Sequence, residues 1–444
     1  MSLREIYKKT VPAGLRERIA GLGMRQKLEA WSLEREGERL LRRQEGRTAG
    51  DGRLHVVFIL QRPALWENQR SVYRAMAQDE RFSVTVIVIP KRPPMARGYD
   101  FEEYETEKEF LRAEKIPFVE GYDGAAGRWI HPFAYGVADV YILPQPYNHT
   151  QPFMYCAPYL SRFAHVTTWA YGSGMILGPS FYKGMIPCYR HCSHVFVRDP
   201  EEERWFGEAF PDVAAKLRVA GSPSLDGYAE PHVPTHGIWK GKGRRRVVWA
   251  PHFTLPTKYT PHQYATFLQY AKPFLGLLKD FPEVDFVMRP HPELRKFLVA
   301  SGTWAQEQVD AYWHAWTDAA NANIYEGGNL IDFFKEADAM VLDSLGFIMH
   351  YLPTGKPLCF LEHVGRAGMA ESAERVLHEN AAAWNEEDVR RFLTETVLGG
   401  ADPHAERRAE LCRRYYGKTL GHAGKNIAEI LWREIAEAKS DGLR

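Results

Sequence analysis

Two separate series of short apolar runs, each alternating with helical stretches, constrain the fold more than any other feature of this chain. The runs of the first series lie at 54–60, 83–89, 138–144, 165–170 and 194–197. Those of the second lie at 246–250, 284–288, 339–343 and 357–362, with amphipathic helices predicted at about 262–279, 304–317 and 329–336. Apolar strands separated by helices are typical of parallel sheets covered on both faces. The pattern therefore predicts an α/β protein with two doubly wound domains.

The chain of 444 residues is too long for one ordinary hydrophobic core, which agrees with more than one domain. We predict a helical N-terminal appendage, an N-terminal domain, a C-terminal domain, and C-terminal helices that pack back across the domains. Their ranges are 1–50, 51–230, 231–403 and 404–444. The segment 231–246 is rich in Pro, Gly and cations and is interpreted as an interdomain linker.

The charge balance and the cysteine content indicate which partners the protein can bind and in which cellular compartment it resides. Lys and Arg total 57 against 56 Asp and Glu, so no global positive field favours nucleic acid. Five cysteines form no disulfide framework, which predicts a cytoplasmic protein. No apolar run reaches the roughly 18 residues that a membrane helix needs. The basic N-terminal appendage leaves peripheral contact with the inner face of the membrane as an alternative to a solvated helical face.

The strands of the second series end in polar groups that suit an anion. Three of them are followed by His252, by Arg289 and His291, and by Asp343 and Ser344. In open α/β sheets, ligands collect outside the carboxyl ends of the strands. We therefore expect these side chains to line one pocket, although a single His-Pro after a strand is also ordinary turn chemistry.

Each of these residues has a chemical reason to meet a diphosphate. Arg289 offers a planar fork, and His252 and His291 offer N–H donors that can become cationic near neutral pH. Ser344 opens a predicted helix, and a helix start attracts phosphate. Asp343 would repel phosphate, so we expect it to cap the turn or orient a histidine. We predict that His252 and His291 are the catalytic residues, with either one able to act as a general acid.

Other candidates lie elsewhere along the chain. Glu362 follows the last strand of the second series and is a candidate contact to the ribose or base of a nucleotide. Gln145, Tyr147 and Tyr171 lie in loops after strands of the first series, where they face an acceptor or simply pack. The dense Cys and His of 188–194 match no common zinc spacing, and Asp-x-Asp is missing from the sequence. We predict no metal and no cofactor besides the nucleotide-linked substrate.

Four stretches together resemble the CDP-glycerol glycerophosphotransferase family, which comprises the teichoic-acid primases and polymerases and their capsule-locus relatives. They are AGSPSLDGY (220–228), VVWAPHFTL (247–255), VDFVMRPHPEL (284–294) and NLIDFFKEADAMVLDSLGF (329–347). The similarity covers 220–365 well and 135–180 more faintly. The combination is more specific than any one motif.

The resemblance implies a GT-B fold of two facing Rossmann-like domains, with the donor bound by the C-terminal domain and the acceptor by the N-terminal one. It also implies metal-independent transfer of a glycerol-phosphate or polyol-phosphate unit from a CDP-linked donor to a polysaccharide or lipid-linked hydroxyl. Peripheral membrane association is a further implication. His291 matches the family's motif histidine at the donor phosphates, and Asp343-Ser344 matches its phosphate turn.

One departure from the family bears on the reaction. Where relatives carry Trp-His-Gly, with a histidine that looks like the general base, this chain has Trp169-Ala170-Tyr171-Gly172. A tyrosine with a pKa near 10 is a poor base at neutral pH, so the base stays unassigned. The alternatives are a GT-B glycosyltransferase, a nucleotide-sugar epimerase or hydrolase with another donor, and a catalytically degenerate module that binds donor or polymer. Oligomeric state does not follow from the sequence.

Overall fold

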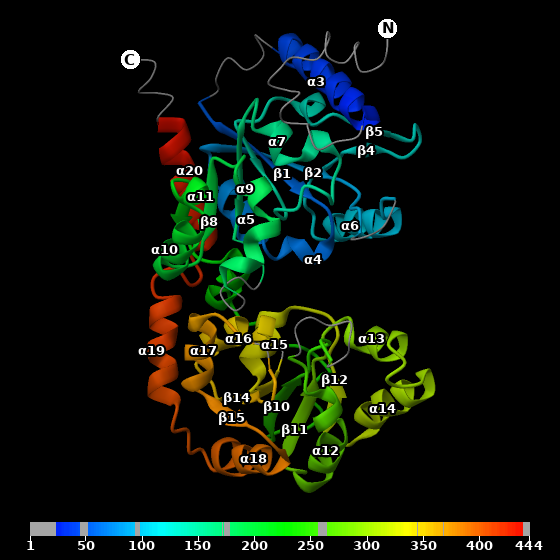
Figure 1. Ribbon diagram of the computed structural model, residues 1–444, viewed down its shortest axis with the longest axis vertical. Coiled ribbons are helices and arrows are strands. Elements are labelled where there is room, and N and C mark those ends of the chain that lie inside the picture. Colours follow the sequence, from blue (N-terminus) through cyan, green and yellow to red (C-terminus); the bar gives the residue numbers. More distant parts are fainter. Residues whose placement is uncertain are drawn as a thin grey trace. The chain divides into compact units, whose positions relative to one another are not determined.

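The computed structural model describes residues 24–44, 52–93, 98–170, 172, 178–255, 264–343, 345–366 and 368–437. These residues form two compact units. The first contains the described residues up to 170, then 182–226, and again from 421 onward. The second contains 172, 178–181 and 227–420. Figure 1 shows that each unit is built on a parallel sheet with helices packed around it.

The sheet of the first unit has the order β3-β2-β1-β6-β7-β8-β9, and all its strands are parallel. The strands are β1 (Leu54–Leu60), β2 (Phe82–Val88), β3 (Val119–Glu120), β6 (Val140–Ile142), β7 (His165–Trp169), β8 (His194–Val197) and β9 (Leu217–Val219). A separate antiparallel hairpin joins β4 (Tyr122–Asp123) and β5 (Arg128–Trp129). Because β1 pairs with both β2 and β6, the strand order reverses between β1 and β6, where such sheets bind ligands.

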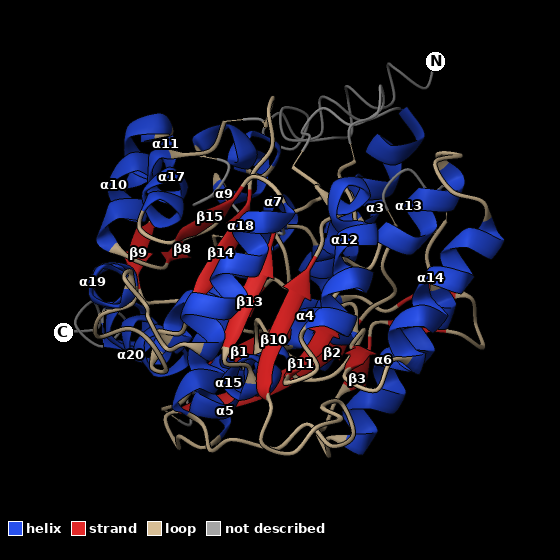
Figure 2. Ribbon diagram, turned by 90° about the horizontal axis from the view of Figure 1, so that it is seen from below, coloured by secondary structure: helices blue, strands red, loops and turns tan. Residues whose placement is uncertain are grey.

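The sheet of the second unit repeats this order as β12-β11-β10-β13-β14-β15. Its strands are β10 (Arg245–Ala250), β11 (Val284–Met288), β12 (Ala322–Ile324), β13 (Ala339–Leu342), β14 (Leu358–Leu361) and β15 (Ala381–Ala383). Figure 2 shows β10, β13 and β14 side by side with helices flanking the sheet. The reversal here lies between β10 and β13, so their carboxyl ends define the expected ligand position.

Helices complete both units. Those of the first are α3 (Met24–Gln44), α4 (Pro63–Trp66), α5 (Arg70–Ala77), α6 (Phe101–Ala113), α7 (Ala157–Leu160), α9 (Ile186–Tyr189), α10 (Pro200–Ala209), α11 (Pro211–Ala214) and α20 (Ala423–Leu431). Those of the second are α12 (Phe267–Asp280), α13 (Leu294–Ala300), α14 (Gln306–Asp318), α15 (Leu330–Glu336), α16 (Leu345–Tyr351), α17 (Glu371–His378), α18 (Glu386–Arg391) and α19 (Ala405–Tyr415). The 3-10 turns are η1 (Pro132–Tyr135), η2 (Phe153–Tyr155), η3 (Pro179–Gly184), η4 (Pro223–Ala229) and η5 (Leu352–Thr354), and the π-helical turns are η6 (Phe392–Leu398) and η7 (Trp432–Glu437).

A stack of aromatic rings forms the core beneath the carboxyl end of β10. Trp249 is fully buried, and its ring centroid lies 4.0 Å from that of Phe274, 5.7 Å from that of Phe267 and 5.5 Å from that of Trp316. Buried aromatic side chains contribute large apolar areas in fixed orientations. Trp249 therefore anchors the end of β10, from which the next residues enter the candidate site.

The C-terminal tail divides between the units: α19 belongs to the second and α20 to the first. The carboxylate of Asp226 accepts hydrogen bonds from the N–H groups of Ala423 (2.9 Å) and Gly424 (2.7 Å), which open α20. A Cβ at Gly424 would lie 2.5 Å from the carbonyl carbon and oxygen of Ser71 in α5. The absence of a side chain at this position thus lets α20 approach α5 closely.

The segment 231–246 does not connect the units, which corrects its interpretation as a linker. The chain passes from the first unit to the second at Asp226 and Gly227. The segment then lies on the second unit, where Glu336 accepts hydrogen bonds from Thr235 N (2.6 Å) and Trp239 Nε1 (2.7 Å). The segment is an irregular arm that side-chain contacts hold on the second unit. Its Pro, Gly and Lys content is common to such arms and to linkers, so composition alone does not distinguish the two.

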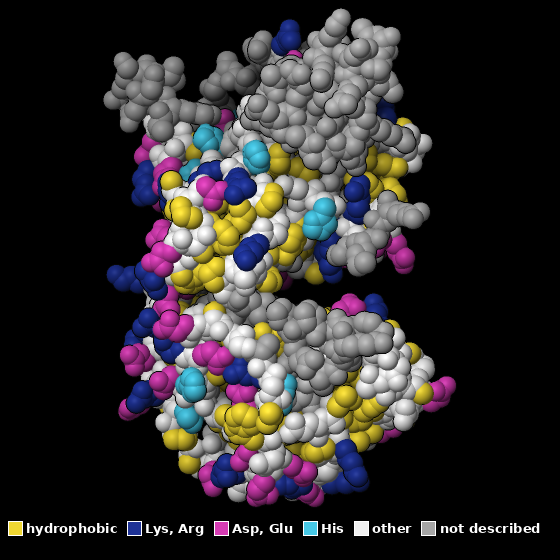
Figure 3. Space-filling model, in the orientation of Figure 1, with side chains coloured by type: hydrophobic (Ala, Val, Ile, Leu, Met, Phe, Trp, Pro, Cys, Tyr) yellow, Lys and Arg dark blue, Asp and Glu magenta, His cyan; other side chains and the backbone are white. Residues whose placement is uncertain are grey.

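The predicted fold class is confirmed: the sheets are parallel, doubly wound and accompanied by helices. The long apolar runs became strands at nearly the predicted positions, while two- and three-residue strands such as β3, β9 and β12 had no recognisable signal. Within the described residues, none of the helices is both long and apolar enough to cross a membrane. On the face seen in Figure 3, Lys and Arg side chains are interspersed with Asp and Glu, as the net charge of +1 leads one to expect.

Candidate functional site

His252 and His291 come together because they follow neighbouring parallel strands. Backbone pairing continues past the ends of β10 and β11: Arg289 N donates to Trp249 O (2.7 Å) and His291 N donates to Pro251 O (3.0 Å). The two imidazole centroids consequently lie 4.9 Å apart, with the rings inclined by 66°. The predicted meeting of these two histidines at one sheet edge is what the structure shows.

Each imidazole has one nitrogen engaged by the backbone. Thr254 N donates to Nδ1 of His252 (3.3 Å), and Glu293 N donates to Nδ1 of His291 (3.2 Å). A nitrogen that accepts cannot carry the proton, so the hydrogen of each neutral ring resides on Nε2. Within the described part of the chain, neither Nε2 has a hydrogen-bond partner. The site therefore presents two unused N–H donors side by side.

Burial favours the neutral form of both histidines. Burial, reinforced by His291, lowers the pKa of His252 to about 3. Burial also lowers the pKa of His291 to about 4, and the nearby Arg289 charge contributes in the same direction. Burial removes part of the hydration that stabilises a charged imidazole, so the pKa values of both rings lie below the ordinary value of 6.5.

Arg289 supplies the permanent charge of the site. Its Nη1 donates to the carbonyl oxygen of Tyr325 (2.9 Å), and its guanidinium lies 5.4 Å from the centre of the Tyr325 ring. Its Nε is enclosed and has no hydrogen-bond partner among the described residues. Burial lowers the Arg289 pKa, yet a guanidinium keeps its proton under all ordinary conditions. The Arg289 charge also acts on His291, whose pKa it lowers.

Asp343 holds the backbone of the site in place through hydrogen bonds. It is completely buried, with Oδ1 accepting from His252 N (2.6 Å) and Oδ2 accepting from the backbone N–H and the hydroxyl of Thr266. Burial raises the Asp343 pKa to about 6, and these hydrogen bonds oppose the rise. The carboxylate thus fixes the His252 loop through its backbone amide and has no oxygen left to face a ligand. Ser344 lies outside the described residues, so its contact with phosphate stays a prediction.

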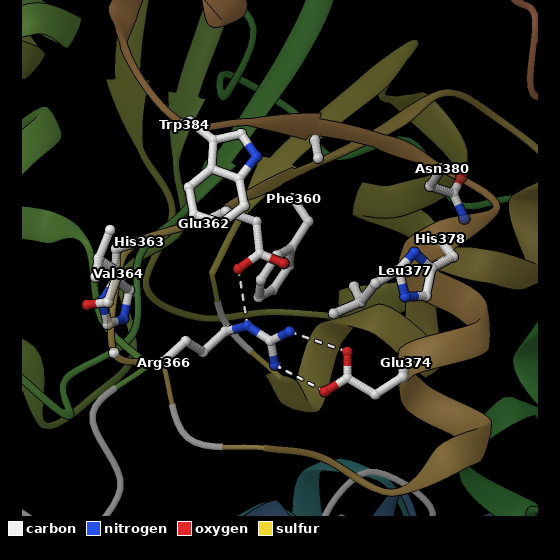
Figure 4. Close-up of a pocket in the computed structure, with 12 residues that line it drawn as sticks. Phe360, Glu362, His363, Val364, Arg366, Glu374, Leu377, His378, Asn380 and Trp384 are labelled. Atoms are coloured by element: carbon white, nitrogen blue, oxygen red, sulfur yellow. Dashed lines mark hydrogen bonds and ion pairs between the residues drawn. The ribbon is translucent and has the colours of Figure 1, made fainter.

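Glu362 lies in a pocket of about 570 Å³ beside β14 and β15. Figure 4 shows Arg366 between two carboxylates: its Nε donates to Glu362 Oε2 (2.8 Å), and its terminal nitrogens donate to both oxygens of Glu374 (3.1 and 2.9 Å). The ring of Trp384 contributes another wall and is 53% exposed. The pocket combines an anchored carboxylate with an open aromatic face.

The acceptor-side candidates have different surroundings. Gln145 is 3% exposed, and its Nε2 donates to Gln61 Oε1 (2.7 Å) and Thr150 Oγ1 (3.1 Å). The amide hydrogens of Gln145 are therefore used within the protein, where they hold the loops after β1 and β6 together. Tyr147 accepts from Thr150 through its carbonyl oxygen (2.9 Å), and its ring is partly exposed. Tyr171 lies outside the described residues.

Solved structures share this arrangement of two sheets. The wall teichoic acid polymerase TagF, soaked with CDPG, is similar with a TM-score of 0.55 and 12% identity over 92% of this chain and 98% of that chain. S. aureus MnaA with UDP gives a TM-score of 0.56 and 10% identity over 86% of this chain and 96% of that chain. The UDP-GlcNAc 2-epimerase from Neisseria meningitidis gives a TM-score of 0.54 and 12% identity over 86% of this chain and 100% of that chain. The chain has a GT-B fold.

Sequence comparison adds nothing further about the GT-B chain, because no protein-family model and no curated protein matches it. Identities of 10 to 12% establish the fold alone. The chemistry of this GT-B protein must therefore be argued from its own residues.

The cysteine-rich segment of the GT-B chain has a structural explanation. Cys188 and Cys192 are both buried, and Cys192 Sγ donates to the carbonyl oxygen of Cys188 (3.6 Å). The neighbouring Cys192 thiol, together with burial, raises the pKa of Cys188. Among the described residues, three or more His, Cys, Asp or Glu side chains nowhere gather in a way that could hold a metal ion.

Two residues of the site escaped the sequence analysis. Thr266, at the N-cap position of α12, binds Asp343 through both its amide and its hydroxyl. Tyr325 follows the short strand β12 and lies against Arg289. Threonine directly before an apolar helix is a recognisable start signal, whereas three residues of strand are too few to show a pattern.

Proposed function

We propose that this GT-B chain transfers a glycerol-phosphate or related polyol-phosphate unit from a CDP-linked donor to a hydroxyl acceptor during the synthesis of a cell-surface polysaccharide. The observation that carries the proposal is the pair of unused Nε2 donors on His252 and His291, next to the fixed charge of Arg289. The family motifs that include these three residues support the choice of a CDP-linked donor. The fold similarity to TagF, which extends over 92% of the chain, supports it as well.

The donor diphosphate binds, in this proposal, across the carboxyl ends of β10 and β11. His252 and His291 each donate one N–H to phosphoryl oxygens, and Arg289 balances the charge. Neutral rings enter as hydrogen-bond donors, and the approaching phosphates raise the pKa values of both rings because a nearby anion favours the charged imidazolium. In this proposal the cationic side chains neutralise the diphosphate charge, as a divalent metal does in other transferases.

The reaction exchanges one phosphorus–oxygen bond for another. The acceptor hydroxyl attacks the phosphorus that carries the polyol, and the bond from that phosphorus to the bridging oxygen breaks. The hydroxyl proton passes to a base that stays unassigned, and CMP leaves with the bridging oxygen. Negative charge grows on the departing phosphate, where His252, His291 and Arg289 stabilise it or supply a proton.

Glu362 and its pocket are the proposed site of the nucleoside. β14 is two strand positions from β10, which at ordinary strand spacing is about 10 Å, within reach of an extended nucleotide. The anchored carboxylate suits ribose hydroxyls, and the exposed face of Trp384 suits a base. The acceptor, polysaccharide or lipid-linked, is proposed to bind the first unit, with peripheral membrane contact as part of the same proposal.

A second candidate is a nucleotide-sugar epimerase. Its support is the similarity to MnaA and the Neisseria enzyme, whose TM-scores equal that of TagF within 0.01. The two candidates differ in the nucleotide base and in the product. An epimerase would act on a UDP-sugar without an acceptor, whereas the transferase releases CMP only when an acceptor hydroxyl is present.

The test is calorimetric titration of the full chain with CDP, CDP-glycerol, UDP and UDP-GlcNAc, followed by assay of CMP release. The proposal predicts that CDP-glycerol binds at least tenfold more tightly than UDP-GlcNAc. Tighter binding of UDP-GlcNAc, with interconversion of the sugar, would establish the epimerase instead. Binding of CDP-glycerol without CMP release in the presence of acceptor polymers would leave a donor-binding module.

A further inference from the structure

A second pair of cations lies on the first unit, outside the site described above. Strands β1 and β2 are parallel neighbours, with Leu60 paired to Val88 at their carboxyl ends. Arg62 follows β1 at the start of α4, and Lys91 follows β2, so the two side chains leave adjacent strand ends. The carboxyl edge of a parallel sheet is where α/β units bind ligands.

Lys91 is buried, and no described residue serves as its counterion. The residue is 9% exposed, and its ammonium makes no hydrogen bond or ion pair with any described residue. Burial lowers the Lys91 pKa, and the charge of Arg62 lowers it further, by more than Glu103 or Asp100 raises it. A buried ammonium without a partner among the described residues costs free energy unless a ligand compensates it.

None of the described carboxylates near Lys91 pairs with its ammonium, and Glu103 pairs with Arg62 instead. Glu103 Oε1 lies 3.1 Å from Arg62 Nε, and the Asp100 side chain caps α6 by accepting from Glu103 N (2.9 Å). Glu107 is completely buried, and burial raises its pKa to about 8, so it is protonated at neutral pH. Both oxygens of Glu107 lack a hydrogen-bond partner among the described residues, and neither bonds to Lys91. The described residues therefore do not supply an anion to Lys91.

We propose that Lys91 and Arg62 bind a phosphoryl group at the carboxyl edge of the first unit. A guanidinium fork and an ammonium are the two protein groups best suited to phosphate oxygens, and here they emerge from adjacent strands. The site is separate from the histidine pair, which belongs to the second unit. We assign the phosphoryl group to the acceptor substrate. That assignment rests on the proposed function, whereas the anion site itself does not.

The test uses the full chain with CDP present in excess, so that the site on the second unit is occupied. Glycerol 3-phosphate is titrated as a soluble phosphate, and vesicles containing phosphatidylglycerol present the same chemistry on a lipid. In the variants Lys91→Met and Arg62→Gln we expect binding of the preferred probe to weaken at least tenfold. Lys183→Met, which removes an exposed charge from the same unit, should leave it unchanged. The probe that binds tells whether the natural phosphate is soluble or lipid-borne.

Stability measurements separate binding from folding. Methionine keeps the buried stem of Lys91 and removes a charge without a partner, so Lys91→Met should keep or raise the melting temperature. The proposal is overturned if neither probe binds the wild-type chain, or if both variants bind as well as Lys183→Met does. Affinity for CDP, measured separately, should not change in Lys91→Met. A wild-type chain that fails to bind CDP but binds glycerol 3-phosphate through Lys91 would contradict the proposed function and leave the anion site standing.

Discussion

The imidazole rings of His252 and His291 lie 4.9 Å apart, and each has its Nδ1 occupied by the backbone N–H two residues further along the chain. The same local turn thus occurs twice, after two adjacent strands, and it directs both Nε2 hydrogens away from the backbone. This relationship converts two neutral rings into a paired donor for an anion, with Arg289 nearby as the fixed charge. The following expectations derive from it and from the packing around it.

Replacement His291→Ala should lower turnover of the donor about a hundredfold while the fold stays intact. One donor to the growing charge of the leaving phosphate contributes about 3 kcal/mol to the transition state, which corresponds to that factor. The measurement is the rate of CMP release from CDP-glycerol under saturating donor. His314→Ala, which removes an exposed imidazole from the same unit, is the matched control and should be neutral. Equal turnover in both variants would remove His291 from the site.

Affinity for CDP-glycerol should increase as the pH falls from 7.5 to 5.5. The unliganded rings take up protons only near pH 4 and pH 3, below their ordinary value of 6.5, so at pH 5.5 they are neutral before binding. Phosphates raise both pKa values, and binding then takes up protons, which acid favours. Both phosphates of CDP-glycerol are diesters and do not titrate in this range.

Calorimetry in two buffers of different ionisation enthalpy measures that proton uptake directly. The uptake should disappear in the double variant His252→Ala and His291→Ala. A wild-type affinity that is constant between pH 5.5 and 7.5 would mean that the rings stay neutral in the complex and act as hydrogen-bond donors only.

Replacement Asp343→Asn should destabilise the second unit by about 2–3 kcal/mol, since an amide nitrogen would face N–H and O–H donors that now meet a buried carboxylate. Thr266→Val removes only the hydroxyl bond and should cost about 1 kcal/mol. Denaturant unfolding measures both values. Asp343→Asn should also weaken donor binding, because it frees the His252 loop, and unchanged stability would show that the carboxylate does not hold that loop.

Replacement Gly424→Ala should destabilise the first unit, although the same change in an exposed helix normally stabilises by up to about 1 kcal/mol. The added Cβ would lie 2.5 Å from backbone atoms of Ser71, which cannot yield without moving α5. Gly276→Ala in α12 is the control, because its nearest neighbour is the end of the Arg390 side chain at 3.9 Å. Opposite shifts in melting temperature are expected, and a stabilised Gly424→Ala would mean that α20 is not held closely against α5.

The sequence predicted the part of the site that is formed by residues at the ends of strands. Parallel neighbours place their carboxyl ends at one edge, so His252 and His291 were expected to meet once the apolar runs 246–250 and 284–288 were identified as strands. The contacts that support these residues could not be predicted from the sequence. Thr266 reaches Asp343 across 77 positions of the chain, and no local pattern reports a bond between residues so far apart.

What the sequence determined by itself is the α/β architecture, because the period and length of apolar runs follow from how each segment must bury its own side chains. The tertiary structure alone decided the surroundings that lower the pKa values of His252 and His291, the enclosure of Gln145, the attachment of 231–246 to the second unit and the burial of Lys91. Burial and hydrogen bonding depend on groups brought together from distant positions. Charge state and accessibility, on which function rests, therefore appear only after folding.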